Sequence, residues 1–101
     1  MKFNYQKIYN ISKKIGDSFY LLDSDIFKIN YIKFQSEFSK FYNKTSMGYS
    51  YKTNYTPSFC SIVNELGGYA EVVSEMEMDL ALKLGVDYKR IIYNGPYKSY
   101  K

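Results

Sequence analysis

Residues 46–96 read SMGYSYKTNYTPSFCSIVNELGGYAEVVSEMEMDLALKLGVDYKRIIYNGP, and the fold can be inferred from this stretch. Short apolar runs at 46–51, 69–73 and 90–93 are separated by two segments whose apolar residues recur at helical spacing. Strands that alternate with helices in this way are joined by right-handed crossovers into a parallel sheet. The stretch therefore predicts an α/β fold.

The two intervening segments carry signals for where a helix starts and stops. Thr56-Pro57 combines an N-cap residue with a proline at the first helical position, where the missing N–H is harmless. Ser74 is followed three residues later by Glu77, which is the pattern of a capping box. Glycines at 67–68 and at 85 are expected to end the two helices.

Toward the amino terminus the pattern predicts a helix, a strand and a second helix. Apolar spacing favours a short amphipathic helix within 1–16, and residues 1–17 are interpreted as a helical extension. The apolar run at 18–22 predicts a strand. Within 23–41, aromatic residues recur on one helix face, which favours their burial in the core. These aromatic residues are Phe27, Tyr31, Phe34, Phe38 and Phe41.

Composition argues against several classes of function. The 101-residue chain has a net charge of +4, but its lysines are scattered, so a nucleic-acid partner is not expected. No run of about 18 apolar residues is present, so no membrane span is expected. The single cysteine, Cys60, excludes an internal disulfide and fits a cytoplasmic protein. With no histidine and no metal-ligand spacing, we expect no metal site.

Candidate site residues lie where the predicted strands end, because function in parallel α/β folds collects at that edge. Lys52 closes the run 46–51, and poor solvation there would favour the free amine, a nucleophile able to form a Schiff base with an aldehyde. Glu71 lies in the run 69–73 and could face a cation. Position alone also allows both to be ordinary solvated side chains.

An ordered series of motifs resembles the diaminopimelate and ornithine type of pyridoxal phosphate (PLP) decarboxylases. The family pattern Tyr-Ala-Val-Lys-Ala/Cys-Asn corresponds to residues 49–54, and Asp-Val-Val-Ser corresponds to residues 71–74. The family's opening strand resembles 19–23, and its Arg-Ile-Ile, turn and lysine resemble 90–98. The likeness thus runs in order along residues 18–99.

The resemblance implies an alanine-racemase-like (β/α)8 TIM barrel, of which residues 18–101 would form the N-terminal part, about the first three βα units. It implies that Lys52 forms the Schiff base with PLP and that Glu71 is the acidic residue near the cofactor. It further implies a small amino-acid substrate, with diaminopimelate as the first expectation, and a homodimer when full length. Thr53, Glu71 and the Glu75-Met76 pair depart from the family pattern, which leaves the substrate open.

A full barrel needs roughly 200 residues or more. The family's remaining site residues lie further along, so we expect this chain to be an N-terminal fragment that is inactive alone. Two alternatives stay open at this stage. One is a PLP-binding racemase or carrier barrel without decarboxylase activity. The other is a non-enzymatic basic binding module, which would require exposed aromatic side chains.

Overall fold

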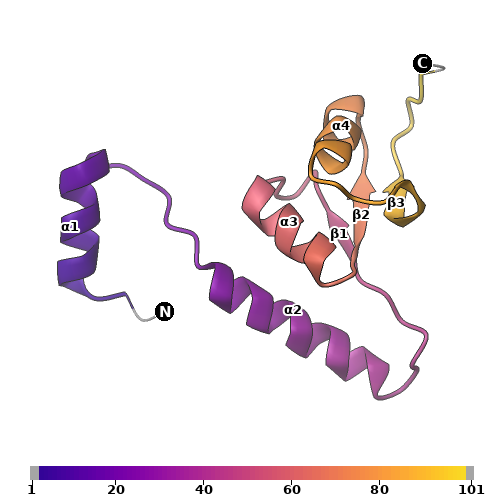
Figure 1. Cartoon of the computed structure of the whole chain (residues 1–101), viewed down its shortest axis with the longest axis horizontal. Coiled ribbons are helices and arrows are strands. Elements are labelled where there is room, and N and C mark those ends of the chain that lie inside the picture. Colours follow the sequence, from indigo (N-terminus) through magenta and orange to yellow (C-terminus); the bar gives the residue numbers. More distant parts are fainter. Residues whose placement is uncertain (1–2, 100–101) are drawn as a thin grey trace.

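The computed structural model describes residues 3–99, which form four α-helices, one 3-10 helix and three strands (Figure 1). In chain order these are α1 (Tyr5–Ile15), α2 (Ser24–Ser39), β1 (Gly48–Ser50), α3 (Pro57–Glu65), β2 (Tyr69–Val72), α4 (Glu75–Lys83), a 3-10 helix (Tyr88–Arg90) and β3 (Ile91–Tyr93). The helix expected within residues 1–16 is confirmed as α1, which has no buried residue. Among the described residues, no helix is long and apolar enough to span a membrane.

The three strands form one parallel sheet in the order β1-β2-β3, as the alternating pattern predicted. The register places Ser50 opposite Glu71, and Glu71 opposite Ile92. Helices α3 and α4 are the crossovers between successive strands. A parallel sheet with helical crossovers is the defining arrangement of α/β folds, so the predicted α/β class is confirmed.

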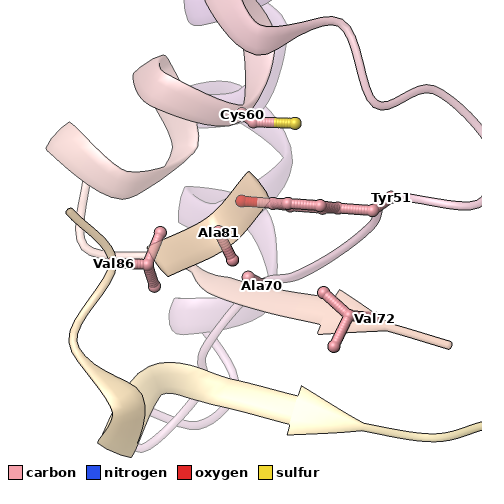
Figure 2. Close-up of a cluster of buried hydrophobic side chains, with 6 residues drawn as sticks. All are labelled: Tyr51, Cys60, Ala70, Val72, Ala81 and Val86. Atoms are coloured by element: carbon pink, nitrogen blue, oxygen red, sulfur yellow. The ribbon is translucent and has the colours of Figure 1, made fainter. Parts of the chain in front are cut away.

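The core lies on the face of the sheet against which α3 and α4 pack. Figure 2 shows its buried side chains, with the Tyr51 ring extending from the end of β1 toward Cys60 and Ala81. Successive side chains of a strand point to opposite faces. Because Ala70 and Val72 point into this core, Glu71 points to the other face. That second face, free of α3 and α4, therefore carries the polar side chains of the sheet.

The amino-terminal edge of the sheet is held by Arg90. Its Nη1 donates to the carbonyl oxygens of Asn64 (3.2 Å) and Gly68 (3.3 Å), and its Nη2 donates to Asn64 Oδ1 (2.7 Å). One side chain thereby joins the end of α3, the start of β2 and the start of β3. In barrel folds this edge serves stability, whereas the opposite edge carries function.

We expect Arg90→Ala to lower the free energy of unfolding by about 1.5–3 kcal/mol, because it removes charge-assisted hydrogen bonds from half-buried acceptors. Chemical denaturation of the protein, at the length its source cell makes, would measure the change. Lys89→Ala is the matched control, because Lys89 is exposed and its side chain contacts only the Tyr88 ring. Equal losses in the two variants would contradict the assigned role of Arg90.

The strand expected at residues 18–22 is wrong. Residues 18–23 have no regular secondary structure, and the side chains of Tyr20, Leu21 and Leu22 are exposed. A strand exists only through its ladder of hydrogen bonds with a neighbour, and no described strand pairs with this segment. The apolar run at 18–22 therefore correctly indicated a non-helical segment, but a strand also needs a neighbouring strand to pair with.

The expected burial of the aromatic residues in α2 is confirmed for two of them and wrong for three. Phe27 stacks on Phe59 with ring centroids 4.3 Å apart, and Tyr31 is buried. Phe34, Phe38 and Phe41 are exposed. Only the first half of α2 lies against α3, and its carboxyl-terminal half projects beyond the sheet (Figure 1). The periodicity identified the helix correctly but not the length over which it is covered.

Candidate functional site

The candidate site is the carboxyl edge of the sheet, where three parallel strands end side by side. Backbone hydrogen bonds extend the ladder beyond the strands, from Tyr51 N to Glu71 O (2.9 Å) and from Asn94 N to Val72 O (2.8 Å). The chain segments that leave the strands therefore start from one continuous, ordered edge. Polar groups carried on these segments share one region of the molecule.

Lys52 lies in the turn that directly follows β1. The preceding residue, Tyr51, is only 1% exposed and anchors this turn in the core. The Thr53 N–H donates to Ser50 O (3.2 Å), which closes the turn around Lys52. The Lys52 side chain is exposed and makes no hydrogen bond or ion pair within residues 3–99. The described residues thus present a primary amine at the edge without enclosing it, contrary to the poorly solvated position that strand-end geometry suggested.

Glu71 lies within β2 and is half-buried. Its register partner on β1 is Ser50, two residues before Lys52, so the carboxylate and the amine belong to neighbouring strands at the same edge. Within the described residues the two groups form no ion pair. The structure therefore brings both predicted site residues to one edge, with space left between their charged ends.

Ser50 carries a polar atom that sequence reasoning did not single out. Its Oγ is shielded from solvent, and no described group hydrogen bonds to it. The edge thus combines an accessible amine, a carboxylate and an unpartnered hydroxyl. An aldehyde cofactor with several polar oxygens needs this kind of donor set, since the amine can bond to the aldehyde and the hydroxyl can donate to an oxygen. These residues fit PLP.

The exit of β2 is held by a buried carboxylate. Glu77 is 3% exposed, and its Oε2 accepts a hydrogen bond from the Val73 N–H at 2.6 Å. The Ser74 Oγ accepts from the Glu77 N–H (3.3 Å), which confirms Ser74 as the N-cap of α4. In the predicted capping box Glu77 would reach back to the N–H of the cap residue, but here it reaches one residue further, to Val73. The capping pair therefore also fixes the backbone that leaves β2.

Gly95 packs against this same exit. A β-carbon added at Gly95 would collide with the carbonyl oxygen of Val73 and would lie 2.9 Å from the Tyr93 ring. Only glycine therefore allows the turns after β2 and β3 to lie this close together. The family likeness over residues 90–98 includes a turn, but a close approach between two distant segments has no local signal.

Cys60 takes no part in the site. It is buried in the core beside Tyr51, and burial raises the pKa of its thiol. Burial also raises the pKa of the Tyr51 hydroxyl, so both groups stay protonated at neutral pH. Cys60 is therefore a packing residue of the core. Across residues 3–99, no three side chains of the metal-binding types come together.

Comparison with known proteins identifies the class to which this edge belongs. Residues 28–101 match the family described as "Pyridoxal-dependent decarboxylase, pyridoxal binding domain", and the chain belongs to this family. The resemblance inferred from the motifs is thereby confirmed, as is PLP as the cofactor of the family.

Particular relatives are decarboxylases of amino acids. The chain is 32% identical over 97 residues to a diaminopimelate decarboxylase of Helicobacter pylori strain J99, covering 96% of this chain and 23% of the relative. It is 29% identical over 93 residues to that of Methanocaldococcus jannaschii, covering 88% and 21%. The chain thus spans less than a quarter of the length of these two curated relatives.

Solved structures agree with the fold. The lysine decarboxylase from Selenomonas ruminantium superposes with a TM-score of 0.77 at 26% identity, covering 99% of this chain and 25% of that one. The structure of SrLDC in complex with PLP and cadaverine gives a TM-score of 0.81 at 27% identity, with the same coverage. The three-stranded sheet and its helices therefore correspond to part of a PLP decarboxylase barrel.

Proposed function

We propose that this chain forms part of a PLP-dependent amino-acid decarboxylase in which Lys52 holds the cofactor covalently and Glu71 is its acidic neighbour. The observation that carries the proposal is the position of Lys52, an exposed amine without a partner among residues 3–99, at the carboxyl edge of the sheet in a chain of this family. The pairing of Glu71 with Ser50 on the adjacent strand supports a position for its carboxylate beside the same ligand.

Each residue has a distinct part in the proposed reaction. Lys52 would hold the cofactor through its Nζ, and the same amine, when not bonded to the cofactor, could accept or return a proton. The Glu71 carboxylate stabilises positive charge that develops beside it. PLP, when bound, supplies the electron sink for the carbanion left by loss of the substrate carboxylate.

Diaminopimelate is the first substrate we propose, because several curated relatives are named diaminopimelate decarboxylase. A lysine/ornithine decarboxylase of Selenomonas ruminantium, 28% identical over 93 residues, supports basic amino acids as the wider class. The proposal includes a homodimer, which rests on the family resemblance alone. It also includes a cytoplasmic location, with no nucleic-acid or membrane partner, consistent with one buried thiol and scattered lysines.

Borohydride reduction tests the covalent role of Lys52. The protein, at the length its source cell makes, would be incubated with PLP, reduced, digested and analysed by mass spectrometry. We expect one dominant phosphopyridoxyl group, on the peptide that contains Lys52. Lys44 is the internal control, because it is an exposed lysine in the turn before the same strand. Labelling spread equally over Lys44 and other surface lysines would remove the basis of the proposal.

A further inference from the structure

The hydroxyl of Ser50 is the one described feature of the site edge that lacks an explanation in the fold. Its Oγ is shielded from solvent and has no hydrogen-bond partner within residues 3–99. Buried hydroxyls in native proteins are almost always hydrogen-bonded, because losing water without gaining a partner is unfavourable. The Ser50 hydroxyl therefore calls for a partner from outside residues 3–99.

The surroundings of Ser50 indicate where that group would lie. Tyr49 and Tyr51 flank Ser50 on β1 and pack with the core beneath α3 and α4, so Ser50 points to the opposite face. Glu71, its register partner, points to that same face. Ser50 is the last residue of β1, and Lys52 follows two residues later at the strand exit.

The fold gives no reason for a hydroxyl at this place. Strand positions favour β-branched and aromatic residues, and serine contributes neither bulk nor a ladder hydrogen bond through its side chain. The ladder around Ser50 is made by backbone groups alone, through Tyr51 N and Glu71 O. An alanine would fill the same position without burying a polar atom.

We propose that Ser50 is a further cofactor-binding residue, whose hydroxyl donates a hydrogen bond to an oxygen of the PLP held through Lys52. The inference rests on the proposed function, since it requires the cofactor at this edge. Ser50 then gains in the loaded protein the partner that it lacks among residues 3–99. The hydrogen bond favours cofactor binding and contributes nothing to folding.

The variant Ser50→Ala separates these two effects. We expect the dissociation constant for PLP to rise about three- to tenfold, the range for one lost hydrogen bond. In the cofactor-free protein the thermal midpoint should be unchanged or higher, because the variant removes an unpartnered buried hydroxyl. Spectrophotometric titration and thermal unfolding of the protein, at the length its source cell makes, would measure the two quantities.

Ser36→Ala is the matched control, because Ser36 is exposed on α2 and bonds only to Lys33 O within its own helix. Its PLP affinity should equal that of the unmodified protein. An unchanged PLP affinity of the Ser50→Ala protein, or a lower thermal midpoint without cofactor, would overturn the inference. If Lys52 were still labelled in the unmodified protein, the proposed function would stand. Failure of Lys52 labelling in the unmodified protein would overturn both.

Discussion

The Lys52→Ala protein is expected to lose the borohydride-stable attachment of PLP and to release carbon dioxide from diaminopimelate about 10²–10⁴-fold more slowly. This decrease equals the usual contribution of a positioned acid–base group to a reaction rate, because the variant removes the amine that would move protons during the reaction. The measurement is carbon dioxide release by the protein at the length its source cell makes. Isomerisation of the substrate without carbon dioxide from the unmodified protein would instead indicate a racemase.

Two further measurements separate chemistry from folding in this variant. Because Lys52 is exposed, its removal should change the free energy of unfolding by less than about 0.5 kcal/mol. Added methylamine should restore part of the rate, since a small amine can take the place of the missing Nζ. Lys44→Ala, which removes an exposed lysine at the other end of β1, should keep full activity. A Lys52→Ala protein with normal turnover would exclude the proposed role.

The second large effect is expected at Gly95, where alanine should lower the free energy of unfolding by about 3 kcal/mol. The added β-carbon would meet the backbone of Val73, with its carbonyl carbon 2.8 Å away. Backbone cannot rotate aside as a flexible side chain can, so the turns after β2 and β3 must separate. Denaturant unfolding would measure the loss, and weaker PLP binding should accompany it, because these turns form the site edge.

Gly48→Ala provides the comparison for Gly95. Gly48 is also a strand-associated glycine, but a β-carbon there would have nothing within 4 Å. Its backbone does not have a positive φ, so alanine fits without strain. We expect stability within about 0.5 kcal/mol of the unmodified protein. If both glycine variants lost the same stability, the cause would be a general strand effect and not the Val73 contact.

Local patterns in the sequence were sufficient for the order of elements in residues 46–93. The switch between strand-like runs and helical spacing, with Pro57 at the start of α3 and the Ser74 cap at the start of α4, indicated both helices and the parallel sheet. Thr56 occupies the N-cap position of α3, but its side chain makes no capping hydrogen bond. Lys52 could be selected because a strand end in a parallel sheet is a place for chemistry and because its motif resembles a known family. These features depend on neighbours close in sequence, which is why periodicity and motif reveal them.

Only the tertiary structure decided which of the predicted strands pair and which of the apolar side chains are buried. The run at 18–22 lacks a paired strand, and the aromatic residues at the end of α2 lie beyond α3 and stay exposed. The Gly95 approach to Val73 and the unpartnered hydroxyl of Ser50 likewise arise from segments that are distant in sequence. Burial and hydrogen bonding of this kind depend on what lies opposite in space, and spacing along one segment carries no record of that. The sequence therefore determined the helices and strands of residues 46–93 and indicated Lys52 as the candidate cofactor lysine, whereas packing determined the surroundings of that lysine.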